Sequence, residues 1–356
     1  MAAKLQRIGL VGASSLLGKE LNDELVESTL SAAELILLGA EEAAGQLVSA
    51  GDEASFIQRL TTASFEGLDF VFFAAGTEVT LEHWQAARRA GATIVDLSGA
   101  LENEPGVLVR APWMRSIVSD ASTGSAVTVK GAGLPDLNTA AVVAADPASV
   151  MLALVAARIH SKLPVQSIVA TLMEPASEFG RAAMDELHQQ TVSLLSFHDL
   201  PREQYDAQVA FNLLPDLGHD AKVSLSRAQQ RIEQHYATIS GGVLPRIDLQ
   251  VIHAPVFHGH TASVLVELRD PAAITQVEEA LAGEHVELVT EESDPPSNLS
   301  ASGSRGVLTR VRPAGGESGG RRYWLWLATD NLKLAAANAI ACAIELRRFR
   351  PQGKVQ

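Results

Sequence analysis

The sequence predicts an α/β protein with two domains, the first built on a doubly wound parallel sheet and the second of the α+β type. Three observations support this prediction. Apolar runs alternate with helical patterns through the first 130 residues, a glycine turn follows the first run, and later apolar runs follow one another without intervening helices. A chain of 356 residues supplies enough apolar residues for two cores.

The first domain is predicted from strands that alternate with helices. The run at 68–76 is apolar at nearly every position, as expected for a central parallel strand that is covered on both faces. Apolar residues at helical spacing predict the helices. The predicted strands are residues 7–12, 33–42, 68–76 and 92–99, and the predicted helices are residues 14–28 and 80–91.

The second domain is predicted to hold a mostly antiparallel sheet with helices on one face. Two loop-rich stretches interrupt it, and the first, 291–306, is either a substrate loop or a mobile surface connection. The other stretch is 312–322. The predicted strands are residues 165–175, 208–218, 248–257 and 261–270, and the predicted helices are residues 146–160, 181–197 and 330–349.

Composition excludes several classes of protein. The formal net charge of −14 disfavours nucleic-acid binding, and the short basic stretch at 347–354 is too small to offset it. No apolar run is long enough to span a bilayer, and the first residues enter a strand without a signal-peptide pattern. The single cysteine excludes an internal disulfide and a multi-cysteine zinc site. We therefore expect a cytoplasmic protein with no metal site, no membrane partner and no nucleic-acid partner.

A glycine turn lies between the first predicted strand and the first predicted helix. Gly12 would form the tight turn, and Gly18 would let the helix pack closely on the strand. The free N–H groups of the helix, with Ser14 and Ser15, could bind a pyrophosphate. Because Ser15 stands where a third glycine is usual, the alternative is a turn that binds nothing.

Two carboxylates follow the second predicted strand. An acidic residue at this position accepts hydrogen bonds from the ribose of NAD, whereas an arginine would bind the 2′-phosphate of NADP. Glu41 and Glu42 therefore favour NAD over NADP, if a dinucleotide binds. The alternative is that both are solvated loop carboxylates.

Seven stretches in the same order resemble aspartate-semialdehyde dehydrogenase. They are "RIGLVGASSLLGKEL", "FVFFAAG", "GATIVDLSGAL", "AMDELHQQT", "FNLLPDLG", "HAPVFHGHTASVLVEL" and "ATDNLKLAAANAI". The resemblance implies a Rossmann-type NAD(P)-binding domain at 1–130, completed by a C-terminal helix at 329–350, and a semialdehyde dehydrogenase-type dimerisation and catalytic domain at 131–328. It also implies a homodimer, and the long apolar strands of the second domain agree with this.

The glycine turn, the two carboxylates that favour NAD and the resemblance together give a set of expected cofactor-binding positions in this chain. These positions are Gly12, Ser14, Ser15, Leu16, Gly18, Glu41, Ala75, Gly76, Ser98, Ser177 and Asn331.

The family reduces an acyl phosphate to an aldehyde through a cysteine nucleophile and a histidine. The proline of "ADPASV" aligns with the proline of the family's nucleophile turn, which places Ser149 at the cysteine, or Ala148 after a slip of one residue. A serine would form a poorly reducible ester, so the alternative is an ordinary residue in the first turn of a helix. His260 occupies the position of the family's histidine. The only thiol, Cys342, lies in the last helix and is expected to be a buried core residue.

The residues that bind anions in the family are also replaced. His253 stands at the arginine that binds the substrate carboxylate, Glu102 near the arginine that binds phosphate, and Glu174 near the substrate glutamine. Neither an imidazole nor a carboxylate supplies the bidentate fork of a guanidinium. The family's Glu-x-x-Lys pair falls near Ala228 and Arg231. This chain would then lack the acidic residue of the pair and keep a positive charge.

This pattern resembles the family's Usg-type branch, which lacks the cysteine. We therefore expect an aspartate-semialdehyde dehydrogenase-like protein that binds NAD(P) or a small metabolite without the family's reductive dephosphorylation. One alternative is an active NAD(P)-dependent semialdehyde dehydrogenase of amino-acid biosynthesis. Another is a dimeric interaction protein that is not an enzyme and binds no nucleotide.

Overall fold

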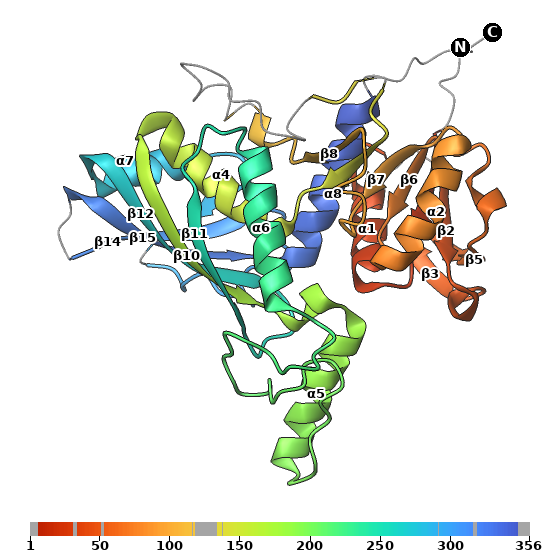
Figure 1. Ribbon diagram of the computed structural model, residues 1–356. Helices are drawn as coiled ribbons and strands as arrows, with labels where there is room; N and C mark the ends of the chain where they lie inside the picture. The colour runs from red at the N-terminus through yellow and green to blue at the C-terminus, as the bar shows by residue number, and fades with distance from the viewer. Residues whose placement is uncertain are drawn as a thin grey trace. The chain divides into compact units, whose positions relative to one another are not determined.

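The computed structural model describes residues 6–30, 34–50, 53–115, 117, 134–136, 138–290, 292–315 and 319–347 (Figure 1). The chain divides into two compact units. The first unit comprises residues 1–113, 129–146 and 335–356, and the second comprises residues 114–128 and 147–334. Parts of three expectations fall outside the described residues. They are the last residues of the basic stretch at 347–354, residues 348–350 of the expected C-terminal helix, and the domain boundary expected at 130.

The first unit contains the parallel sheet that the sequence predicts. Its strand order is β5-β2-β1-β6-β7-β9-β8, and every pairing in it is parallel. Its elements are β1 (Arg7–Val11), α1 (Leu16–Glu27), β2 (Glu34–Gly39), η1 (Glu41–Ala43), β3 (Leu47–Ala50), β4 (Glu53–Phe56), β5 (Gln58–Arg59), η2 (Thr62–Phe65), β6 (Phe70–Phe73), α2 (Thr77–Arg89), β7 (Thr93–Asp96), β8 (Val107–Arg110) and β9 (Ala141–Ala144).

Helix α8 (Asn331–Arg347) supplies part of the core of this unit. Ala339, Cys342 and Ala343 are fully buried in one cluster with strand residues such as Phe72. Because β9 pairs with β7 and β8, the first unit extends through residue 146, beyond the boundary expected at 130.

The second unit is built on a mixed sheet with the order β11-β10-β12-β15-β14-β13. The pairs β10–β11 and β13–β14 are parallel, and the other pairs in this order are antiparallel. Its elements are α4 (Pro147–Lys162), β10 (Val165–Glu174), η3 (Ala176–Phe179), α5 (Arg181–Leu195), α6 (Leu225–Ile239), β11 (Ile247–His253), β12 (His260–Ala273), α7 (Ile274–Leu281), β13 (Val286–Leu288), β14 (Val307–Pro313) and β15 (Gly319–Thr329).

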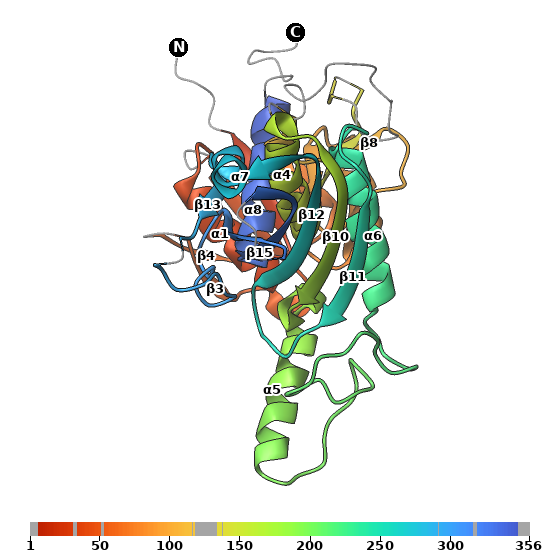
Figure 2. The ribbon, with the colours of Figure 1, turned by 90° about the vertical axis from the view of Figure 1, so that its left-hand side faces the viewer.

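One face of this sheet is open among the described residues. In Figure 2 the strands face the viewer and α4 lies behind them. Residues alternate along β10 and β15, so Val169, Trp324 and Trp326 are exposed while Ala170 and Leu325 are buried. Helix α5 extends away from the end of the sheet in both views.

The prediction of a strand at 208–218 is wrong. These residues form a loop that touches the sheet through one isolated bridge, Leu214 to His253. Gln190 of α5 accepts hydrogen bonds from the N–H groups of Val209 and Ala210 at 2.8 and 3.2 Å. The apolar residues of the loop therefore pack in a separate small core with α5, not in the sheet.

Among the described residues, the helices lack the combination of length and apolar composition that a bilayer-spanning segment requires.

Candidate functional site

The glycine turn of the first unit is tightly packed. Gly12 has a φ of +85°, and a Cβ there would lie 2.7 Å from the backbone nitrogen of Ala75. A Cβ on Gly18 would lie 2.1 Å from the carbonyl oxygen of Gly12. Both positions therefore require glycine, and they bring the N-terminus of α1 against the end of β6.

Ser15 is the N-cap of α1. Its Oγ accepts a hydrogen bond from the N–H of Gly18 at 2.8 Å and donates to the carbonyl oxygen of Ala74 at 2.8 Å. Because its one hydroxyl proton is donated to the backbone, Ser15 does not offer phosphate the donor that we expected from the sequence. Ser14 is exposed beside it, and Leu16, half-buried, begins the helix.

The carboxyl end of β6 lies beside this turn. In the sheet, β2 lies on one side of β1 and β6 lies on the other, so the direction in which successive strands are added reverses between β1 and β6. Dinucleotides bind at such a switch point in related sheets. Gly76 is the N-cap of α2, and no heavy atom lies within 4 Å of a Cβ built on it. These residues fit a pyrophosphate group, since a helix N-terminus faces open space beside a tight turn.

Asp96 holds the turn after β7. This buried carboxylate accepts hydrogen bonds from the N–H of Ser98 at 2.7 Å, the hydroxyl of Ser98 at 2.6 Å and the N–H of Leu101 at 3.0 Å. Glu102 follows in the same turn, half-buried, and its N–H donates to Gly99. The sequence signal for Asp96, a polar residue at the end of an apolar strand, was available and was missed.

An arginine that sequence reasoning missed stands beside Glu41. Arg59 Nε lies 2.6 Å from Glu41 Oε2, and both side chains are more than half exposed. Arg59 pairs in register with Gly39 at the end of β2, although it is 18 residues away from Glu41 in the chain. The end of β2 therefore carries a carboxylate and a guanidinium together, with Glu42 exposed beside them.

Three strand ends meet in the second unit and bring together residues that the sequence singled out. Glu174 ends β10, His253 ends β11 in register with it, and His260 begins β12. His260 Nε2 lies 3.1 Å from Glu174 Oε2, and both side chains are buried. The imidazole and the carboxylate thus form a buried hydrogen-bonded pair.

A second carboxylate, Glu178 of η3, approaches the same imidazole. Its Oε2 lies 3.8 Å from His260 Nε2. Burial raises the pKa of Glu178, and the nearby charges of His260 and Arg231 act in the opposite direction. Arg231 is a half-buried residue of α6, and Ala228 lies one turn before it. Sequence reasoning missed Glu178, four residues after Glu174.

Ser177 and Asn331 join this cluster through hydrogen bonds. Asn331 Nδ2 donates to Ser177 Oγ and to Glu178 Oε2, each at 3.0 Å. Asn331 Oδ1 accepts from the N–H of Gly259 at 3.0 Å. Asn331 therefore fixes Glu178 and the residue before His260, in addition to the cofactor role that the resemblance implies for it.

His253 is fully buried in an aromatic environment. Its ring lies 4.8 Å from the ring of Tyr205 and 6.2 Å from that of Phe179, centroid to centroid. Neither ring nitrogen has a hydrogen-bond partner. Burial lowers the pKa of His253 to about 4, so the ring is neutral at pH 7 and supplies no charge for a substrate carboxylate.

Ser149 lies in the first turn of α4, which begins at Pro147. Its side chain is fully buried, and its Oγ donates to the carbonyl oxygen of Ile232 on α6 at 3.0 Å. Ala148 is also fully buried. The hydroxyl at the aligned nucleophile position thus ties two helices of the second unit together.

Cys342 lies in the core of the first unit, as expected. Its side chain is fully buried, its Sγ lies 3.7 Å from the carbonyl oxygen of Arg110, and burial raises the pKa of the thiol. A thiol of this kind is not a nucleophile at neutral pH. Among the described residues, no group of three or more His, Cys, Asp or Glu residues could hold a metal ion.

The sequence matches two family models that together cover most of the chain. Residues 7–157 match the NAD binding domain of semialdehyde dehydrogenase, and residues 157–333 match its dimerisation domain. The boundary between these matches at residue 157 falls inside α4.

Individual relatives cover almost the whole chain. The USG-1 protein homolog of Pseudomonas aeruginosa is 30% identical over 94% of this chain and 95% of its own length. The aspartate-semialdehyde dehydrogenase of Rickettsia conorii is 25% identical over 96% of this chain and 98% of its own length. The fold matches that of aspartate semialdehyde dehydrogenase II of Vibrio cholerae complexed with ASA, with a TM-score of 0.82, 22% identity and coverage of 97% and 99% of the two chains. The chain therefore belongs to the semialdehyde dehydrogenase family, on the Usg-type branch that the USG-1 protein homologs represent.

Proposed function

We propose that this protein is a homodimer that binds a nicotinamide dinucleotide, NAD in preference to NADP, and does not catalyse the phosphate-dependent oxidation of aspartate semialdehyde or its reverse. The observation that carries the loss of activity is the hydrogen bond from Ser149 Oγ to the carbonyl oxygen of Ile232. A hydroxyl that donates its one proton to a main-chain carbonyl must first be released and then deprotonated before it can attack.

The anion-binding positions support the same conclusion. His253 is neutral at pH 7 and packed against two aromatic rings, and Glu102 would repel a phosphate. Loss of a nucleophile alone typically costs several orders of magnitude in rate, and here the positions that bind both anionic groups of the substrate differ as well.

The dinucleotide would bind at the ends of β1, β2 and β6. The backbone at Gly12 and Gly76 and the N-terminus of α1 would hold the pyrophosphate, and Glu41 would accept hydrogen bonds from the adenosine ribose. When bound, the nicotinamide supplies a hydride acceptor or donor. Arg59 cancels part of the charge of Glu41, so we expect the preference for NAD to be modest.

The homodimer is supported by the match to the dimerisation domain and by the open sheet face of the second unit. Val169, Trp324 and Trp326 are exposed on that face, and large exposed apolar side chains mark interaction surfaces.

The test of inactivity uses the full chain with aspartate semialdehyde, phosphate and NAD or NADP, followed by the absorbance of the reduced dinucleotide. We expect no turnover for the wild type or for Ser149→Cys, because a thiol at this position does not replace the missing anion-binding residues. Turnover by the wild type above about 1 s⁻¹, within the usual range of enzymes, would contradict the proposal.

Dinucleotide binding is tested separately by thermal shift, because a ligand that binds only the folded state raises the Tm. We expect NAD to raise the Tm of the wild type and of Gly76→Asn. Gly76→Asp, which differs from Gly76→Asn by one charge, should lose the shift through repulsion of the pyrophosphate. No shift for the wild type with either dinucleotide at millimolar concentration would favour the interaction protein that binds no nucleotide.

A second candidate function is an active NAD(P)-dependent dehydrogenase with His260 as its base. The observation that favours it is the buried pair with Glu174, since a carboxylate that orients an imidazole is a common device of acid–base catalysis. The turnover assay distinguishes the two candidates.

A further inference from the structure

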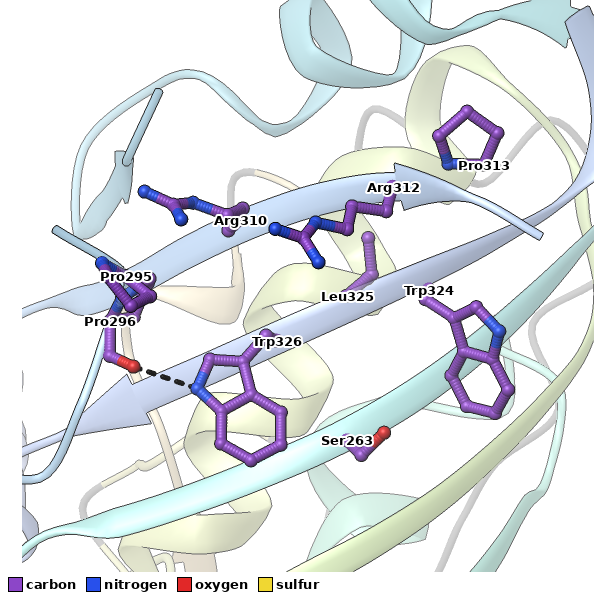
Figure 3. Close-up of a pocket in the computed structure, with 9 residues that line it drawn as sticks. All are labelled: Ser263, Pro295, Pro296, Arg310, Arg312, Pro313, Trp324, Leu325 and Trp326. Carbon is purple, nitrogen blue, oxygen red and sulfur yellow. Dashed lines mark hydrogen bonds between the residues drawn. The ribbon is translucent and has the colours of Figure 1, made fainter. Parts of the chain in front are cut away.

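A pocket of about 630 Å³ lies on the open face of the second unit (Figure 3). Trp324 and Trp326 project into it from β15, and Arg310 and Arg312 stand opposite them on β14, in register as Arg310–Trp326 and Arg312–Trp324. Pro296 lies at one end. The volume falls within the range of cavities that enclose a drug-sized ligand, so it can accept one aromatic side chain with its neighbours.

Two of the polar groups in this pocket are used to build it. The guanidinium of Arg310 donates to the carbonyl oxygens of Thr290 and Ser293 at 2.6 and 2.5 Å. The indole N–H of Trp326 donates to the carbonyl oxygen of Pro296 at 2.8 Å. Arg312, by contrast, is exposed and pairs with no side chain in the part of the chain that the structure describes. Trp324 is 45% exposed. The pocket thus presents an indole face and one available cation.

A second feature of the same unit has the opposite chemistry. We define the arm as residues 181–224, which comprise α5 and the loop that follows it. At its tip Phe197 is 96% exposed, and Asp199, also exposed, has no partner among the described residues. Leu195 is exposed beside them.

The exposure of Phe197 costs backbone strain. The N–H of His198 donates to the carbonyl oxygen of Ser193 at 2.9 Å, and the N–H of Phe197 donates to that of Leu194 at 3.4 Å. These are the two bonds of a Schellman motif, in which the residue at the position of Phe197 is usually glycine. Phe197 has a φ of +59°, which is uncommon and unfavourable for a bulky residue. A favourable contact of the Phe197 ring with a surface outside the arm would offset this strain.

The arm and the pocket are separate within one chain. The pocket lies on the open face at β14 and β15, whereas α5 extends beyond the end of the sheet in both views (Figures 1 and 2). Both belong to one compact unit. Only another copy of the chain can therefore bring this arm to this pocket, and a twofold axis would form the contact twice.

We propose that the arm tip of one copy inserts into the open-face pocket of a second copy, with Phe197 against the indole of the partner's Trp324 and Asp199 paired with the partner's Arg312. This inference rests on the proposed homodimer and names the surfaces that form it. Charge complementarity supports it, because Asp199 and Arg312 are both exposed charges without a partner among the described residues. Arg322, two residues before Trp324 on β15, adds positive charge to this strand, and Glu203 adds negative charge to the arm.

The test is a charge exchange measured by sedimentation equilibrium of the full chain at low ionic strength. We expect Asp199→Arg and Arg312→Asp each to weaken dimerisation by about tenfold, and the double variant to recover most of that loss. The matched control is Arg321→Asp, which changes the same charge outside the pocket and should have a much smaller effect. If the single variants remain as tightly dimeric as the wild type, or the double variant shows no recovery, the contact is wrong and the homodimer stands. If the wild type is monomeric at micromolar concentration, the homodimer proposal itself fails.

Phe197→Gly gives a second, independent readout. Glycine relieves the strain at φ +59°, so we expect the variant to raise the Tm at concentrations where the protein is monomeric. The same substitution removes the inserted ring, so dimerisation should weaken by about tenfold. A variant whose dimerisation matches that of the wild type would overturn the inference, because Phe197 would then have no role between copies.

Discussion

His260 and Glu174 form a pair in the second unit that is entirely removed from solvent, with Nε2 and Oε2 separated by 3.1 Å at the adjoining ends of β12 and β10. A buried carboxylate is stable only when its hydrogen bonds are satisfied, and the imidazole satisfies one of them. The pair therefore contributes to the stability of the unit, independently of any catalytic role.

Replacement of Glu174 by alanine should destabilise the protein by about 1–3 kcal/mol, because it leaves the buried ring of His260 without this acceptor. The free energy of unfolding from urea titration measures the change. Glu287→Ala on β13, whose side chain is exposed, is the matched control and should change stability by less than about 0.5 kcal/mol. Equal effects of the two substitutions would show that the pair contributes nothing.

The stability of the protein should decrease as the pH falls from 7 to 5, in part through His253. Burial lowers the pKa of His253 to about 4 from an ordinary 6.5, so in this range the unfolded chain binds a proton that the folded chain does not. Lowering the pH therefore favours the unfolded state, by about 2 kcal/mol from this group between pH 7 and pH 5.

Comparison with His253→Phe isolates this contribution. The raised pKa of Glu178 acts in the opposite sense, because the folded state binds its proton more tightly, but it acts in both proteins and cancels in the difference. We expect the variant to lose about 2 kcal/mol less than the wild type between pH 7 and pH 5, measured by urea denaturation at each pH. Parallel curves for the two proteins would mean that the pKa of His253 is the same in the folded and the unfolded state.

Ser149→Ala should lower the free energy of unfolding by about 1 kcal/mol, since it removes a buried hydrogen bond to Ile232 and leaves the carbonyl without this donor. Thermal and urea denaturation measure the loss. Ser302→Ala in an exposed turn serves as the control for serine removal. A Ser149→Ala variant as stable as the wild type would argue against the structural role of the hydroxyl.

Glu41→Ala should shift dinucleotide preference toward NADP. The substitution removes the carboxylate that repels a 2′-phosphate. It also frees Arg59, whose Nε lies 2.6 Å from Glu41 Oε2 in the wild type. Calorimetric titration should show the ratio of NADP to NAD affinity increased by about tenfold, and Arg59→Ala should change the ratio in the opposite direction. Glu42→Ala is the control, and an equal shift from that variant would assign the effect to net charge alone.

The parallel sheet could be predicted from the sequence because its signals are local. Phe70–Phe73 is apolar at every position, and the turn at Gly12 permits only a residue without a side chain. The position of His260 came from resemblance, since a histidine at the start of a strand carries no distinctive local signal. Its partner Glu174 was identified as a pocket residue, but the bond between them depends on strand register, which the sequence does not specify.

Other features depend on contacts between residues that are distant in the chain. The segment 208–218 has the composition of a strand, but Gln190 of α5 accepts the hydrogen bonds of Val209 and Ala210 that a neighbouring strand would otherwise accept. Arg59 reaches Glu41 only because β5 pairs with β2. Such partners are selected by tertiary packing, so no pattern within the segment itself indicates them.

Helix α8 has a consequence for the order of folding during synthesis. Asn331 at its start belongs to the His260 cluster of the second unit, and from Ala335 onward the helix belongs to the first unit and its core. A ribosome that has translated 330 residues has therefore produced most of both units and completed neither. Until α8 emerges, the apolar surface that Ala339, Cys342 and Ala343 will cover is exposed to water, and exposed apolar surface of this kind is prone to aggregation.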